Sequence, residues 1–195
     1  MRYRLLYWYG EPIIAGERVH YVGGNLARAW REAFERLGIE ERSWHSVLLV
    51  GMGATLIQLL ARSPNPPARL TVLEIDEEMV RLQKTYFHLP LAYEVVIGDA
   101  AETIHALTLR YDGIFVDAFV EEEVPESLID FRFVEALRER LSEQGILIWN
   151  VLRRSQANEV GSMLSMAFPV CRRWSYAPHV FWACAFSAAS FPLPF

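Results

Sequence analysis

Three carboxylates stand where they could do chemistry, because each follows directly on a short apolar run. Glu74, Asp99 and Asp117 close or follow such runs, and another run ends in the glycine-containing turn 51–53. A carboxylate can accept hydrogen bonds from ribose hydroxyls or from an exocyclic amine, and it can act as a general base. Glycines in a turn let backbone amides approach a ligand closely. These residue types together predict a nucleoside site with a base beside it.

The glycine turn departs from the pattern that binds a pyrophosphate. That fingerprint reads G-x-G-x-x-G, and Leu56 stands in place of its third glycine. Asp76, which Glu77 and Glu78 follow, is typical of the N-cap of a helix. Asp117 has a structural alternative of the same kind, as a cap of the loop that follows it. Because the third glycine of the fingerprint is missing, a dinucleotide is not the expected ligand.

The elements that must position these residues alternate between apolar strands and helices, which indicates a parallel sheet covered on both faces. A turn at Ala177-Pro178 joins two further strands into an antiparallel hairpin. We expect strands at 47–50, 70–74, 93–97, 113–117, 146–150, 169–175 and 179–186, and helices at 55–61, 77–86, 101–109, 131–141 and 156–166. The predicted fold class is α/β, a doubly wound, seven-stranded, mostly parallel sheet with an antiparallel C-terminal hairpin. Ligands of such sheets sit at the carboxyl ends of the strands.

The first 45 residues are predicted to form a short accessory segment ahead of the nucleoside-binding domain, 46–195. A strand or hairpin is expected around 3–22, where Gly10 and Pro12 supply turn chemistry. A helix follows over 26–37, with apolar residues on one face, and Gly38 ends it.

Composition narrows the classes of partner. The chain has 195 residues, 52% of them hydrophobic, which suits one domain with a substantial core. Its net charge of −5 argues against nucleic acid as a partner. No signal peptide is apparent at the N-terminus. The uncharged run 174–195 is interrupted by Pro178, Pro192 and Pro194, so we expect no membrane span.

Two cysteines are too few for a disulfide framework. Cys171 and Cys184 lie equidistant from the predicted turn, so they could face each other across the hairpin. We favour the alternative of two buried, reduced thiols in a cytoplasmic protein.

Several of these stretches carry a resemblance. In order, "VLLVGMG", "TVLEID", "VVIGDA" and "YDGIFVDAF" resemble the class I S-adenosylmethionine-dependent methyltransferase fold, which is Rossmann-like, and within it the spermidine synthase-like branch. The stretch 124–151 is similar to the same branch. The resemblance implies that the turn cradles an uncharged thionucleoside, for which a third glycine is not needed.

The resemblance also implies roles for individual residues. Gly51, Met52 and Gly53 would pack against the methionine and ribose portions of S-adenosylmethionine; Glu74 would bind the ribose hydroxyls, Ile75 the adenine ring, and Asp99 and the Ala100 amide the adenine edge. Asp117 matches the general base of the polyamine synthases. We expect Tyr21, Asn25 and Phe119 to lie near Asp117, where the acceptor would bind.

Two departures from the polyamine synthases affect the expected reaction. Ala54 stands where those enzymes carry an aspartate for the charged end of the cofactor, and Val120 and Glu121 replace the end of their D-x-x-D-P motif. We therefore expect a methyltransferase acting on a small molecule. Aminopropyl transfer from decarboxylated S-adenosylmethionine is the first alternative, and a non-catalytic nucleoside-binding or scaffolding module is the second.

No metal is expected at this site. Magnesium-dependent catechol-type methyltransferases carry an Asp-Asn pair after the fifth strand, and here Trp149 precedes Asn150. A site with Asp117 as its one carboxylate binds Mg²⁺ poorly. The expected partner is a small-molecule acceptor, and a homodimer is left open.

Overall fold

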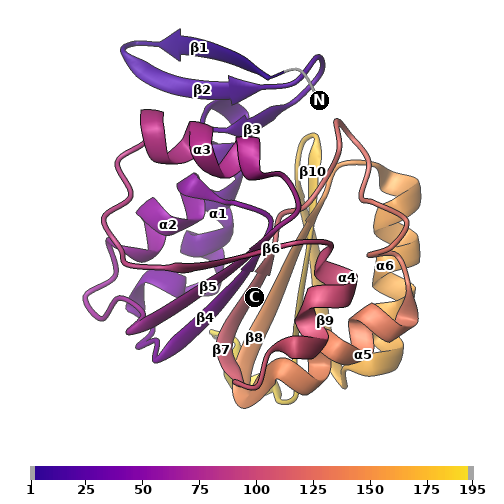
Figure 1. Ribbon diagram of the computed structural model, residues 1–195. Helices are drawn as coiled ribbons and strands as arrows, with labels where there is room; N and C mark the ends of the chain where they lie inside the picture. The colour runs from indigo at the N-terminus through magenta and orange to yellow at the C-terminus, as the bar shows by residue number, and fades with distance from the viewer. Residues whose placement is uncertain (1–2, 193–195) are drawn as a thin grey trace.

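The computed structural model describes residues 3–192 and contains a sheet of seven strands (Figure 1). The strands are β4 (Ser46–Val50), β5 (Arg69–Glu74), β6 (Glu94–Ile97), β7 (Tyr111–Val116), β8 (Leu141–Val151), β9 (Val170–Tyr176) and β10 (His179–Ala185). They lie in the order β6-β5-β4-β7-β8-β10-β9; the first five are parallel to one another, and β10 is antiparallel to both of its neighbours, β8 and β9. The predicted doubly wound sheet with a C-terminal hairpin is confirmed.

Helices cover both faces of this sheet (Figure 1). One face carries α1 (Gly24–Leu37), α2 (Ala54–Leu60) and α3 (Glu77–Tyr86), and the other carries α4 (Ala100–Thr103), α5 (Phe131–Arg140) and α6 (Arg154–Ala167). Short 3-10 helices span Ile39–Glu41, Ile104–Ala106 and Ala188–Ser190. Alternate residues of β4 enter the two layers: Leu49 packs with the first and Leu48 with the second. A central strand buried on both faces must be apolar throughout, as 47–50 are.

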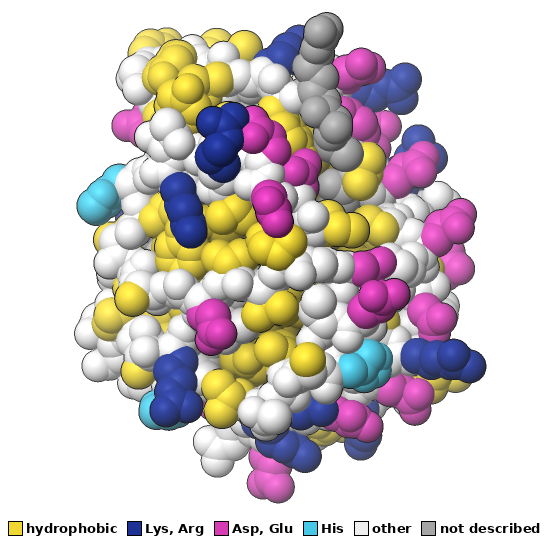
Figure 2. All heavy atoms as spheres, viewed as in Figure 1, with side chains coloured by type: hydrophobic (Ala, Val, Ile, Leu, Met, Phe, Trp, Pro, Cys, Tyr) yellow, Lys and Arg dark blue, Asp and Glu magenta, His cyan; other side chains and the backbone are white. Residues whose placement is uncertain are grey.

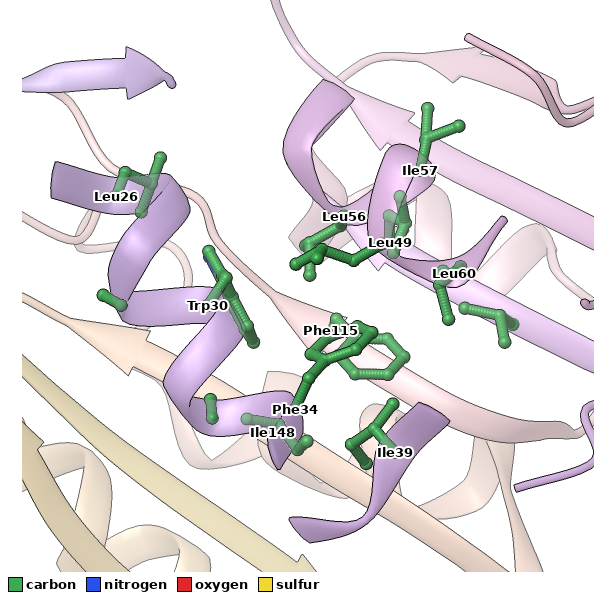
Figure 3. Close-up of a cluster of buried hydrophobic side chains, with 14 of the residues drawn as sticks. Leu26, Trp30, Phe34, Ile39, Leu49, Leu56, Ile57, Leu60, Phe115 and Ile148 are labelled. Atoms are coloured by element: carbon green, nitrogen blue, oxygen red, sulfur yellow. The ribbon is translucent and has the colours of Figure 1, made fainter. Parts of the chain in front are cut away.

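Aromatic side chains fill the layer between α1 and the sheet (Figure 3). The Trp30 ring lies 6.1 Å from Phe115 on β7 and 5.1 Å from Phe181 on β10, and Phe34 stacks on Phe115 at 5.6 Å. Trp30 and Phe115 are fully buried. Helix α1, predicted as accessory, therefore shares one core with the main sheet, and the boundary at residue 45 stays a prediction.

Most predicted elements lie within two residues of their observed bounds, and Gly38 ends α1 in a left-handed conformation (φ 58°). Two differ more. The helix predicted over 101–109 is two short ones that end at Ala106, and Leu109 beyond them is exposed, so burial does not favour continuing the helix there. Strand β8 begins at Leu141, five residues before its predicted start at 146, because Leu141 pairs with Tyr111 ahead of a bulge.

The expectation of reduced thiols is wrong. Cys171 and Cys184 occupy paired positions of β9 and β10 and form a disulfide. Their Cα atoms are 4.2 Å apart, because the turn at Ala177-Pro178 places them directly opposite each other. The alternative, in which the two cysteines face each other across the hairpin, is the one observed.

A second sheet stands over the carboxyl ends of the main strands. It is an antiparallel meander of β1 (Arg4–Trp8), β2 (Glu11–Ala15) and β3 (His20–Val22), where a hairpin was predicted. Tyr7, Trp8 and Tyr9 are exposed on it, and Figure 2 shows hydrophobic side chains at the surface of this hairpin.

Among the described residues, no helix is long and apolar enough to cross a membrane. Residues 174–185 of the uncharged run belong to the C-terminal hairpin instead. The last residues of the run, 193–195 with Pro194, lie outside the part of the chain that the structure describes.

Candidate functional site: a pocket at the strand ends

The site lies where the order of the sheet reverses direction. From β4 the chain proceeds to β5 and β6 on one side, and then returns to add β7 and β8 on the other. Gly51 and Asp117 follow the two central strands, and the Asp117 amide donates to the Val50 carbonyl at 2.9 Å. A doubly wound sheet binds its ligands at this reversal.

Gly51 is required by both conformation and space. Its φ of 92° is in the region that favours glycine, and a Cβ there would lie 2.5 Å from the Asp117 carbonyl oxygen. The turn after β4 can therefore pass close to the end of β7 only with glycine at this position.

Two side chains from other elements fix the turn. Gln83, fully buried on α3, accepts from the Ala54 amide at 2.7 Å and donates to the Met52 carbonyl at 2.5 Å. Glu74 accepts from the Met52 amide at 2.6 Å. These side chains hold the turn in one conformation, and the bonds do not depend on a ligand.

Glu74 remains able to accept further hydrogen bonds. One carboxylate oxygen accepts from Met52 and the other from the Asp76 amide at 2.9 Å. Each oxygen has a second lone pair, so the group can take two more donors, such as the two hydroxyls of a ribose. Burial raises the pKa of Glu74, and the backbone amides oppose that rise.

Two further carboxylates of the pocket begin helices. Asp76 caps α3 through the Glu78 amide, as predicted, and also accepts from the Tyr3 hydroxyl at 2.5 Å. Asp99 caps α4 through the Ala101 amide at 2.9 Å. One oxygen of Asp99 is thereby used for the cap, and the other is available to an exocyclic amine.

Asp117 has the properties expected of a base that works near neutral pH. Its carboxylate accepts a hydrogen bond from the side-chain NH₂ group of Asn150 at 2.8 Å. Burial raises its pKa to about 6, although Asn150 opposes the rise. The buried indole N–H of Trp30 also lowers this pKa, although the pair falls short of hydrogen-bond geometry. The carboxylate bonds to a neighbouring strand, not to the loop that it was alternatively predicted to cap.

Aromatic rings close the pocket beside Asp117. Tyr21 stacks on Phe119 at 5.8 Å, and Tyr3 meets Tyr21 edge-on at 5.6 Å. The Tyr21 hydroxyl accepts from the Glu121 amide at 2.8 Å, and the Glu121 carboxylate accepts from the amides of Glu17 and Arg18. The loop after β7 is thus fastened to the small sheet, and the aromatic wall is fixed between them.

The structure brings most of the predicted site residues together. Gly51, Met52, Glu74, Ile75, Asp99, Ala100, Asp117, Tyr21 and Phe119 all line this pocket. Gly53 begins helix α2 behind the turn. Asn25 borders a different cavity and donates to the Ala177 carbonyl at 3.5 Å. The roles of these residues toward a ligand stay predictions.

Sequence reasoning missed four residues that shape the site: Tyr3, Gln83, Glu121 and Asn150. None belongs to a short motif with a physical reading. In the sequence, Glu121 is noted only as a departure from the D-x-x-D-P motif, and Asn150 only beside Trp149 as evidence against a metal. Their hydrogen-bond partners in the site lie at least 29 positions away in the sequence.

Gln83→Leu is expected to destabilise the protein by about 2–4 kcal/mol, because it leaves the buried Ala54 amide and Met52 carbonyl unpaired. The matched control is Gln58→Leu, which removes one exposed hydrogen bond to His88 and should cost less than about 1 kcal/mol. Urea unfolding measures both values. Equal losses in the two variants would contradict the role assigned to Gln83.

Comparison with known proteins agrees with this fold and places the chain in a family. The model of the spermine/spermidine synthase domain matches residues 38–169. A polyamine aminopropyltransferase of Vibrio vulnificus is 27% identical over 115 residues, which cover 56% of this chain and 38% of that protein. The chain spans less than half the length of the polyamine relatives it matches.

Solved structures share the fold. A probable spermidine synthase from Corynebacterium glutamicum superimposes with a TM-score of 0.76 at 19% identity, over 95% of this chain and 77% of that one. Human methyltransferase-like protein 13, in complex with SAH, gives 0.65 at 18% identity, over 86% and 81%. The predicted Rossmann-like methyltransferase fold is confirmed, and the family match covers most of the chain. The chain belongs to the spermine/spermidine synthase family.

Proposed function

We propose that the chain is a transferase that moves an alkyl group from a sulfonium nucleoside to a nucleophile held beside Asp117. Aminopropyl transfer to an amine is the first candidate, because the curated polyamine relatives favour it over the methyl transfer that the sequence placed first. The observation that carries the proposal is the meeting of Gly51, Glu74, Asp99 and Asp117 in one pocket at the sheet reversal.

The donors and acceptors of the pocket fit a thionucleoside. Glu74 offers two free lone pairs for ribose hydroxyls, and Asp99 keeps one oxygen for an exocyclic amine. Leu73, Met79 and Leu128 supply apolar surface for the adenine ring of the nucleoside. When bound, the sulfonium nucleoside supplies the electrophilic carbon.

The residues of the chain supply the rest. Asp117 takes the proton from the nucleophile. Its raised pKa makes it a stronger base than an ordinary aspartate near neutral pH. Tyr3, Tyr21 and Phe119 exclude water from one side of the pocket and present ring faces and edges to it. The positions of Gly51 and Glu74 are fixed by hydrogen bonds that do not depend on the ligand, which reduces the ordering cost of binding.

Methyl transfer is the second candidate, and one observation favours it. Ala54 is buried, and its amide is already bonded to Gln83. At this position the side chain offers no carboxylate to hold the ammonium end of a decarboxylated cofactor. Its methyl group does not distinguish the two forms of the cofactor by charge.

The test measures binding and transfer separately. The protein is titrated in a calorimeter with S-adenosylmethionine and with its decarboxylated form, and both are then incubated with a panel of amines and small acids. Mass spectrometry of the acceptor identifies either an added aminopropyl or an added methyl group. We expect binding of at least one cofactor and an acceptor that gains the aminopropyl group. Binding with methyl addition alone would establish the second candidate, and binding with no transfer to any acceptor would support the non-catalytic module.

A further inference from the structure

Asp117 is the first member of a chain of three side chains that continues away from the pocket. The Asn150 amide nitrogen donates to Asp117 at 2.8 Å, and the Asn150 oxygen lies 3.1 Å from Nδ1 of His179. Asn150 is fully buried and His179 is 4% exposed. They stand on the neighbouring strands β8 and β10, which fixes their backbones relative to each other.

Charge determines which way each group of the chain points. An ionised Asp117 only accepts hydrogen bonds, so Asn150 must turn its NH₂ group toward it. The Asn150 oxygen then faces His179, and a ring nitrogen bonded to an oxygen must carry a proton. His179 therefore carries its proton on Nδ1, and Nε2 carries the lone pair.

We infer that Asn150 and His179 are positioning residues for Asp117: they hold its carboxylate in one orientation and stabilise its charged form. This inference rests on the proposed function of Asp117 as the base. The chain does not conduct protons, because an amide gives up its N–H proton only by becoming an unfavourable imidic acid. His179 acts by donating to Asn150, which strengthens the hydrogen bond that Asn150 donates to Asp117.

The surroundings of His179 separate this role from titration of the imidazole. His179 borders a second cavity of about 320 Å³, which it shares with the charged or titratable groups of Arg18, His20, Glu122 and Arg153. Arg153 is paired with Glu123 at 2.6 Å. Burial lowers the pKa of His179 to about 4, so the ring stays neutral over the range in which Asp117 titrates.

On its other sides Asp117 faces the nucleoside pocket and the indole N–H of Trp30 on α1. Tyr3, Tyr21, Glu74, Asp76 and Asp99 line the pocket together with Asp117. They are common to all variants of His179, so a change in the pKa of Asp117 between those variants reports on the chain and not on the pocket.

A purely structural role makes different predictions. Buried polar groups are normally hydrogen-bonded, and His179 would then serve only to satisfy Asn150. Replacing it would lower the free energy of unfolding without changing the acidity of Asp117. A positioning role predicts that the acidity changes, and that a side chain with a donor at the place of Nδ1 restores it.

The experiment compares two substitutions of His179 in the full chain. His179→Phe keeps a ring that can stack on Phe181, as the imidazole does at 6.2 Å, but removes the donor. His179→Asn keeps an NH₂ group close to the place of Nδ1. The pKa of the Asp117 carboxyl is read by NMR of protein labelled with ¹³C at the aspartate carboxyl, with Asp117→Asn to assign the signal.

We expect His179→Phe to lower the acid dissociation constant of the Asp117 carboxyl by about threefold or more. His179→Asn should return this constant to within about twofold of wild type. If the transfer reaction is found, kcat of the Phe variant should fall below the shifted pKa and recover above it, with KM for the nucleoside unchanged. An unchanged pKa in a folded His179→Phe protein would overturn the inference, as would an Asn variant no better than Phe.

A second measurement needs no variant. The ¹⁵N shifts of His179 in wild type distinguish the two neutral tautomers, and we expect the proton on Nδ1. A proton on Nε2 would leave Asn150 without its donor and would overturn the inference. Neither NMR measurement depends on turnover, so an inactive protein with the expected pKa and tautomer would refute the proposed function and leave the chain of hydrogen bonds established.

Discussion

Asp117→Asn is expected to lower turnover by about 10²-fold or more, with folding and nucleoside affinity retained. The asparagine can still accept from Asn150, so the hydrogen bond between β7 and β8 survives, but it cannot take a proton from the nucleophile. Calorimetry measures the affinity, and steady-state kinetics with the identified acceptor measures the turnover.

The control is Asp130→Asn, which changes the same charge at the cap of α5, outside the pocket. It should leave turnover within about twofold of wild type. Near wild-type turnover in Asp117→Asn would show that Asp117 is not the base, and the case for chemistry at this strand end would be lost.

Asp117→Asn also changes how the free energy of unfolding depends on pH, and the sign of this change follows from the pKa of Asp117. Native Asp117 has a pKa of about 6, above the ordinary value of 3.8, so the native state holds more protons than the unfolded state between these values. Its contribution to the free energy of unfolding is therefore largest in acid and is lost as pH rises through about 6, by on the order of 2 kcal/mol. Urea unfolding at pH 4.5 and 7.5 should show a smaller loss in Asp117→Asn than in wild type.

Glu74→Ala is expected to abolish most of the rise in melting temperature that S-adenosylmethionine or its demethylated product gives the wild type. The rise follows from binding to the folded state alone, and the substitution removes both carboxylate oxygens that would accept the ribose hydroxyls. It also frees the Met52 and Asp76 amides, so the turn keeps only one of the two side chains that hold it, Gln83. Thermal unfolding with and without millimolar nucleoside measures the effect.

Glu77→Ala is the matched control, because Glu77 is an exposed carboxylate three residues away that does not line the pocket. Its nucleoside-induced shift should equal that of wild type. A full shift in Glu74→Ala would remove the ribose role of Glu74. If neither nucleoside shifts even the wild type, the proposed transferase function loses its main support.

The sequence by itself determined the order of the elements and the edge of the sheet at which the candidate site lies. Apolar runs such as 47–50 must be buried strands, and helices between them force parallel strands whose ends meet at one edge. Gly38 and Asp76 marked helix ends because their roles depend only on local backbone geometry. The pocket at that edge was predictable for the same reason, since its carboxylates all follow strands.

The tertiary structure decided how the side chains of the site are paired. Gln83 fixes a turn 31 residues before it, Tyr3 bonds to Asp76 across 73 positions, and Glu121 reaches Glu17 across 104. Such contacts leave no period or spacing in a sequence, because each depends on two backbones that the fold brings together.

The hairpin and Asp117 illustrate the same division. The turn position indicated that Cys171 and Cys184 could face each other, but only the strand register put them opposite and joined them. The sequence identified Asp117 by its place after a strand. That its carboxylate is held by Asn150, and Asn150 by His179, followed from β7, β8 and β10 lying within reach of one another, with β8 directly beside each of the other two.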